Sequence, residues 1–144
     1  MHWIDAAVEG NLGPGVDYDV TREPTLRGEL AYEFDDWRGD DLVTTAEFWL
    51  CTERLADALR ASDLTGWTLD SVRVSTSDVF DDLHPGGLEL PTWYRLIPGA
   101  DGDIQVRERV FLCVSDSALA LLRRFDISHA EIRPLSAIPP LPNL

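Results

Sequence analysis

Two cysteines occupy matching places in the sequence, and cysteine can act as a nucleophile or a metal ligand. Cys51 ends the apolar run EFWLC and Cys113 ends VFLC, and a small polar residue and a helix-like pattern follow each. A helix N-terminus can lower a thiol pKa, but a reactive thiolate also needs exposure and stabilising neighbours. A free Cys at the end of an apolar strand usually packs as a small hydrophobic residue. We expect both cysteines to be structural, and a Cys-dependent enzyme is the least favoured hypothesis.

The histidines and glycine-rich segments do not complete a catalytic or metal-binding pattern. Nucleophilic hydrolases need a base oriented by a third group, and zinc sites usually show paired spacings such as Cys-x-x-Cys. His2, His84 and His129 are scattered, and the sequence contains no Gly-x-Ser-x-Gly. The segment GADGD at 99–103 lacks the later acidic ligands of a calcium loop. We therefore expect no catalytic residue, no metal and no cofactor.

Charge narrows the class of partner. The chain has 26 acidic residues against 12 basic ones, all arginine, for a formal net charge of −14. Phosphate groups and anionic lipid surfaces attract basic proteins, so neither nucleic acid nor a membrane is an expected partner. A basic protein fits this charge better, because complementary charge accelerates association.

The acidic residues are densest in YEFDDWRGDD at 32–41, around a tryptophan. One interpretation is a solvated loop. The other is a recognition surface, because aromatic side chains often anchor interfaces. We predict that a protein partner contacts Glu33, Asp35, Asp36, Trp37, Asp40, Asp41, Asp81, Asp82, Trp93 and Tyr94.

A small-molecule or peptide pocket is the alternative use of the aromatic residues. Trp67, Trp93 and Tyr94 could line such a pocket. In a strand, adjacent side chains point to opposite faces, so one of the last two would be available for recognition. A dry aromatic cavity would favour this hypothesis over a flat protein-binding surface.

The length of 144 residues and the 44% hydrophobic content predict one folded domain. The start, MHWIDAAVEG, is acidic where a secretory signal is basic, and no apolar run approaches the roughly 20 residues that span a bilayer. Two cysteines do not make a disulfide framework. We expect a cytoplasmic protein, and the sequence leaves its oligomeric state open.

The patterns around the cysteines predict two strand–helix–strand units. In the first, EFWLC is a buried strand, an amphipathic helix spans about 52–62, and WTLDSVRVSTSDVF is a strand candidate. In the second, the helix spans about 115–125 and AEIRPL forms the closing strand.

The remaining patterns complete the predicted fold. GELAYEF alternates like a strand, and TWYRLI and IQVRERVFLC read as a hairpin across a glycine-rich turn. The chain therefore predicts an α+β domain with a mainly antiparallel, partly mixed sheet and two helices. We expect an irregular arm at 1–27 with at most a short strand, a core at 28–135 and a Pro-rich extended tail at 136–144.

The segment GDDLVTTAEFWLCTERLADALRASDLTGWTLDSVRV, followed by LPTWYRLI, resembles immunity-type proteins of bacterial polymorphic toxin systems. The likeness covers roughly 28–135 and rests on the outline and on Leu55, Leu59, Leu64, Thr65, Gly66, Pro91 and Tyr94. It implies a non-enzymatic protein that binds and blocks a cognate toxin. Many such toxins bind nucleic acid and are basic, which suits an acidic inhibitor. An immunity or antitoxin-like inhibitor of a basic toxin domain is our leading hypothesis.

Overall fold

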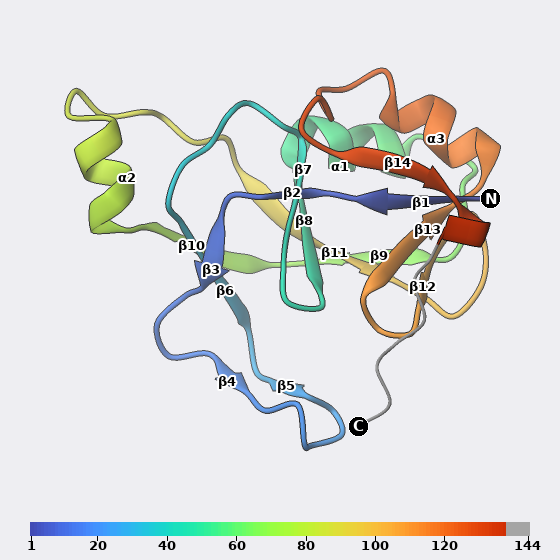
Figure 1. Cartoon of the computed structure of the whole chain (residues 1–144), viewed down its shortest axis with the longest axis horizontal. Coiled ribbons are helices and arrows are strands. Elements are labelled where there is room, and N and C mark those ends of the chain that lie inside the picture. The colour runs from blue at the N-terminus through green and yellow to red at the C-terminus, as the bar shows by residue number, and fades with distance from the viewer. Residues whose placement is uncertain (138–144) are drawn as a thin grey trace.

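Two sheets form the centre of the molecule in the computed structural model, which describes residues 1–137 (Figure 1). Within that range, one sheet has five strands in the order β2–β7–β8–β11–β9, and the other has four in the order β12–β13–β1–β14. The strands of the first are Ala7–Val8 (β2), Leu42–Thr45 (β7), Phe48–Thr52 (β8), Trp93–Pro98 (β11) and Trp67–Asp70 (β9). Those of the second are Ile104–Arg107 (β12), Phe111–Val114 (β13), His2–Asp5 (β1) and Glu131–Pro134 (β14).

Two smaller sheets and the helices complete the described part of the chain. The first small sheet contains Val72–Thr76 (β10), Leu30–Phe34 (β6) and Gly10–Leu12 (β3), and the second pairs Asp17–Tyr18 (β4) with Leu26–Arg27 (β5). The helices are Glu53–Arg60 (α1), Asp78–Leu83 (α2) and Asp116–Leu122 (α3), and a 3-10 turn spans Leu135–Ala137. The fold is α+β with antiparallel and parallel pairing, which confirms the predicted class.

Both central sheets contain the same split strand–helix–strand unit. In the first unit, β8 and β9 are each antiparallel to β11, which lies between them, so they run parallel to each other and α1 connects them. In the second unit, β13 and β14 flank β1 in the same way and α3 connects them. A hairpin strand precedes each unit, β7 before β8 and β12 before β13. The predicted repeat is therefore real, with one antiparallel strand inserted in each copy.

The two units also exchange chain segments. After β1, which completes the second unit, the chain continues into β2, which pairs in parallel with β7 of the first. After β11, which completes the first unit, Gly99 bridges in parallel to Gln105 of β12 in the second. Each unit therefore pairs, backbone to backbone, with a segment of chain that continues from a strand of the other unit.

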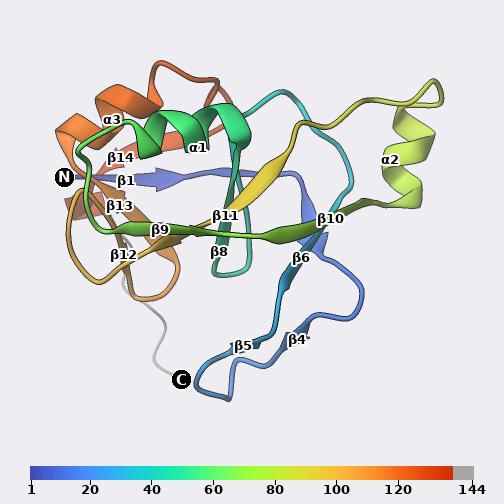
Figure 2. The ribbon, with the colours of Figure 1, turned by 180° about the vertical axis from the view of Figure 1, so that it is seen from behind.

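Alternate side chains of β8 and β11 enter two cores on opposite faces of the five-stranded sheet. Trp49 and Leu96 belong to a core that includes the buried faces of α1 and α3, which lie side by side in Figures 1 and 2. Phe48 and Trp93 belong to the second core, which also contains Tyr32 of β6. Every residue of β8 is buried, as the sequence predicts for EFWLC.

The turn after α1 requires glycine. Gly66 has a φ of +91°, and a Cβ there would meet the backbone of Asp101, Gly102 and Ile104. Its carbonyl accepts a hydrogen bond from the Gly99 amide at 2.6 Å. The Leu-Thr-Gly turn therefore packs directly on the second unit.

The prediction of an irregular arm at 1–27 is wrong. This segment contains β1 to β5, and β1 lies between β13 and β14 at the centre of a sheet. Trp3 and Ile4 are buried. The strands are only two to four residues long, so their local pattern is weak and their pairing comes from partners distant in the sequence.

The helix and tail predictions have mixed outcomes. The helices predicted at 52–62 and 115–125 are present, somewhat shorter, as α1 and α3. The strand candidate at 67–80 divides into β9, β10 and the start of α2, a helix that the sequence pattern did not predict. The tail at 136–144 lies outside the described residues beyond position 137.

Candidate partner-binding surface

Asp41, which we predicted to contact a partner, is internal. It is only 1% exposed. Its carboxylate accepts hydrogen bonds from the Thr52 hydroxyl at 2.6 Å, the Arg54 Nε at 2.6 Å and the Asp126 amide at 2.8 Å. Thr52 precedes α1, and Asp126 lies in the loop after α3. This carboxylate therefore joins the start of one unit's helix to the end of the other's.

Asp40 is also buried, with 0% exposure. Its carboxylate accepts from the backbone amide of His129 at 3.0 Å and lies 2.6 Å from the His129 Nδ1. Its carbonyl accepts from the Trp37 indole at 2.8 Å. The prediction that Asp40 and Asp41 contact a partner is wrong, because both carboxylates are used to satisfy internal donors.

Asp103 plays the equivalent role in the second unit. Its carboxylate accepts from the Ser115 hydroxyl at 2.7 Å and from the Thr65 amide at 2.9 Å. These bonds hold the pKa of Asp103 below its ordinary value, the one from Ser115 being the strongest cause. Ser115 caps α3 and Thr65 follows α1. Asp41 and Asp103 stand 62 residues apart, the same separation as the two cysteines.

The predicted aromatic residues are divided between the two cores. Trp93 is only 5% exposed and packs against Phe34, with ring centroids 5.1 Å apart. Tyr94 is half-buried beneath the Arg60 guanidinium in the other core, where Trp67 also packs. These three aromatic residues do not line a common pocket. Trp93 is not available to a partner.

The other acidic residues of 32–41 hold both ends of α2. Asp35 accepts a hydrogen bond of 2.6 Å from the hydroxyl of Ser77, the N-cap of α2. Asp36 lies 2.7 Å from the Nε2 of His84, the C-cap. The bond to His84 is the main cause that holds the pKa of Asp36 below its ordinary value. Glu33, like these two, is half-buried.

Helix α2 projects from the end of β10, apart from α1 and α3 (Figures 1 and 2). Its side chain Phe80 is buried in the second core. Val79 and Leu83 are 54% and 56% exposed, and their i, i+4 spacing puts them on one face. We define the α2 surface as the exposed residues of this helix, Asp78, Val79, Asp81, Asp82 and Leu83.

The α2 surface is acidic without local compensation. Asp78, Asp81 and Asp82 form no ion pair with any residue between 1 and 137. The sequence contains no arginine between Arg73 and Arg95. The carboxylates therefore remain available to a basic partner.

Of the ten residues predicted to bind, only Asp81 and Asp82 belong to the α2 surface. Asp35 and Asp36 contact Ser77 and His84, the residues that cap the two ends of α2. Trp37 is half-buried and packs near Trp93, with ring centroids 6.0 Å apart. The sequence pattern did not identify Asp78, Val79 and Leu83 as binding residues. The sequence did contain a helix-start signal, a serine at 77 followed by an aspartate at 78. In the structure Ser77 is the N-cap of α2, and its hydroxyl accepts a hydrogen bond from the Phe80 amide at 3.3 Å.

The cysteines have the expected structural role. Cys51 and Cys113 are free and buried. Burial raises the pKa of the Cys51 thiol to about 12 and also raises that of Cys113. A raised pKa disfavours the thiolate, which is the form of cysteine that acts as a nucleophile.

Residues 1–137 contain no group of three or more His, Cys, Asp or Glu side chains positioned to hold a metal ion. None of the helices within that range is both long enough and apolar enough to cross a membrane.

Comparisons with protein-family models, curated proteins and solved structures find no match to this chain.

Proposed function

We propose that this chain is an interaction protein that binds a basic protein through the α2 surface, as an immunity-type inhibitor binds its toxin. The single observation that carries the proposal is the exposed pair Val79 and Leu83 among carboxylates that have no ion-pair partner in the described chain. The resemblance to immunity-type proteins in the sequence supports the same class.

The composition of the α2 surface suits a protein partner. Exposed apolar side chains rimmed by polar groups commonly mark interaction sites. Val79 and Leu83 would lose water on binding, whereas Asp78, Asp81 and Asp82 would steer a basic partner and set its orientation. A nucleic acid would be repelled by the same carboxylates.

The position of α2 also favours binding without large rearrangement. Asp35 and Asp36 hold the two ends of the helix, and Phe80 anchors its inner face in the core. Restraint before binding reduces the entropy that the complex must lose. A six-residue helix that is fixed at three points can therefore present its side chains in one arrangement.

A partner must cover more than α2. Stable interfaces bury about 800 Å² on each protein, which exceeds what five side chains provide. The neighbouring surface includes β10, which is an edge strand of its sheet, and the exposed residues Pro85–Gly87 and Glu89. We expect the partner to extend along this strand and this loop.

The test produces the toxin domain that the proposal expects a neighbouring gene to encode, in a bacterial host with and without this chain. We expect co-expression of the wild-type chain to restore growth. The double variant Asp81→Arg/Asp82→Arg should lose most of the protection, because two repulsive charges replace two attractive ones. The control Asp63→Arg/Asp101→Arg makes the same charge change at exposed sites away from α2 and should protect like wild type.

Two results would overturn the proposal. If no neighbouring gene encodes a toxin, or if the wild-type chain does not protect against the toxin that is encoded there, the immunity function is wrong. If both double variants protect equally well at matched expression levels, binding does not use the α2 surface. Circular dichroism of each purified variant confirms that the fold is retained.

A further inference from the structure

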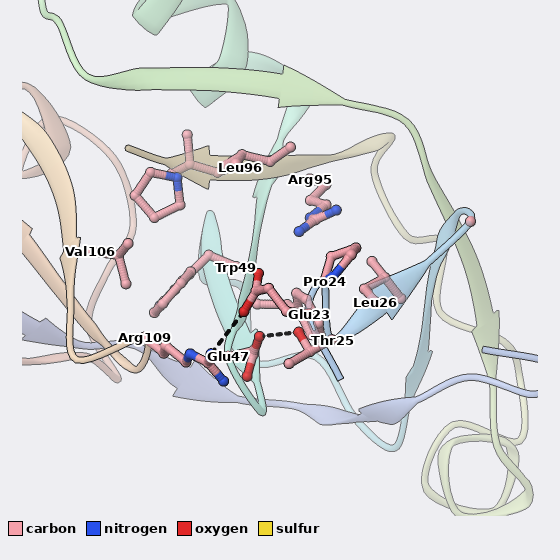
Figure 3. Close-up of a pocket in the computed structure, with 14 residues that line it drawn as sticks. Glu23, Pro24, Thr25, Leu26, Glu47, Trp49, Arg95, Leu96, Val106 and Arg109 are labelled. Carbon is pink, nitrogen blue, oxygen red and sulfur yellow. Dashed lines mark hydrogen bonds and ion pairs between the residues drawn. The ribbon is translucent and has the colours of Figure 1, made fainter. Parts of the chain in front are cut away.

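A cavity of about 360 Å³ lies between the β4–β5 segment and the face of β8 and β11 (Figure 3). Much of its wall is apolar and includes Pro24, Leu26, Phe48, Trp49 and Val106. This volume is within the range of small-molecule sites, which combine apolar walls with a few polar groups. The cavity does not include any residue of the α2 surface.

Arg95 extends into this cavity from β11 (Figure 3). It pairs through the backbone with Leu50 of β8 on one side and Asp70 of β9 on the other, so its position is fixed by a central strand. Its guanidinium lies over the Phe48 ring, 5.1 Å from the centroid. A side chain on such a strand is a precise place for a recognition group.

The Arg95 guanidinium lacks a partner for its donors. It is half-buried and makes no hydrogen bond or ion pair with any residue in 1–137. Burial lowers its pKa, while the negative charges of Asp70 and Glu47 act in the opposite direction. A guanidinium has five N–H donors in a planar fork that matches a carboxylate.

The other charged groups of the cavity are already engaged. Arg109 donates to Glu23 at 2.9 Å, an ion pair that links the β4–β5 segment to the turn before β13 (Figure 3). Glu47 accepts from the Thr25 hydroxyl at 2.5 Å and from the Tyr18 hydroxyl at 3.1 Å. Arg95 is therefore the charged group in this cavity that remains open to a ligand among the described residues.

We propose that this cavity binds a small organic carboxylate with an apolar body. The carboxylate forms a bidentate ion pair with Arg95, and the apolar body packs against Phe48, Trp49 and Val106. Charge-assisted pairs of this kind are strong when partly desolvated, because the fork geometry fits both oxygens. The site is separate from the α2 surface, so it would bind its ligand with or without a protein partner.

The test titrates the purified full chain with butyrate, hexanoate, phenylacetate and 4-phenylbutyrate, each compared with the alcohol of the same skeleton. Binding is followed by backbone amide shifts in two-dimensional NMR and by tryptophan fluorescence, because Trp49 lines the cavity. We expect at least one carboxylate to bind with shifts centred on β8, β11 and β5. The alcohol of the same skeleton should bind at least about tenfold more weakly, because it cannot form an ion pair with Arg95.

The variant Arg95→Gln should weaken carboxylate binding about tenfold or more and leave alcohol binding nearly unchanged. The matched control Arg123→Gln removes an exposed arginine after α3 and should not change either affinity. Equal binding of acid and alcohol would overturn the proposal. So would shifts that map outside the cavity, or no binding by any of the four acids at 10 mM (about the weakest useful affinity). The wild-type measurements decide the matter even if Arg95→Gln does not fold.

Discussion

The carboxylate of Asp41 joins the two units, so removing it should destabilise the fold. Asp41 accepts hydrogen bonds from the Thr52 hydroxyl, from Arg54 and from the Asp126 amide. Replacing it with alanine removes the acceptor and leaves the internal donors without partners. We expect Asp41→Ala to lower the free energy of unfolding by about 4 kcal/mol.

That magnitude follows from the burial of each donor. The Thr52 hydroxyl and the Asp126 amide face an internal site, and each should cost about 1.5 kcal/mol when left unsatisfied. Arg54 is mostly exposed, so solvent screens its ion pair and its loss contributes about 1 kcal/mol or less. Asp41→Asn keeps one acceptor oxygen and should cost about half as much as alanine.

Urea unfolding followed by circular dichroism measures the change. With a slope of about 2 kcal/mol per molar, the midpoint of Asp41→Ala should fall by about 2 M. The control Asp57→Ala removes an exposed carboxylate paired with Arg60 and should cost about 0.5 kcal/mol or less. Hydrogen exchange should also show a faster Asp126 amide. An Asp41→Ala midpoint within about 0.3 M of wild type would refute the proposed link between the units.

Two further predictions concern titration and reactivity. The pKa of Asp103 in the folded protein lies below its ordinary value of 3.8, mainly because the Ser115 hydroxyl donates a hydrogen bond to the carboxylate. The ionised carboxylate therefore stabilises the fold above pH 3.8, and this contribution is lost as the pH falls through the folded pKa. Asp103→Asn should therefore lose stability less steeply than wild type below about pH 4, and parallel curves in acid urea titrations would contradict this. Cys51 and Cys113 should resist alkylation by iodoacetamide at pH 8 and react after unfolding in guanidinium, because burial disfavours both thiolates. Rapid labelling of either cysteine in the native protein would show that its side chain is not buried as described.

Local patterns predicted the two units because each contains a continuous apolar strand followed by an amphipathic stripe. Leu55 and Leu59 fall on the buried face of α1, and Leu121 and Leu122 fall on that of α3. The inserted strands could not be predicted in the same way. β1 pairs with residues more than 100 positions away, and nothing in the sequence of His2–Asp5 identifies them.

The candidate surface was partly predicted, for a physical reason. The sequence does not distinguish a solvated aspartate from one whose carboxylate accepts hydrogen bonds from buried backbone amides. All the aspartates at 32–41 were therefore predicted to be exposed. The structure separates Asp40 and Asp41, which bond internal donors, from Asp35 and Asp36, which support α2. The helix itself was missed because six residues with a β-branched valine are too few to show helical periodicity.

Binding through the α2 surface can be measured by calorimetric titration of the expected partner, a toxin domain encoded by a neighbouring gene, into this chain at low and at physiological salt. We expect tight binding to the wild-type chain that weakens as salt is added. The double variant Asp81→Arg/Asp82→Arg should reduce the affinity about 30-fold, roughly 2 kcal/mol, while Asp63→Arg/Asp101→Arg should change it about threefold or less. Equal affinities for the two double variants, or no heat of binding with the wild-type chain, would show that the α2 surface does not bind this partner.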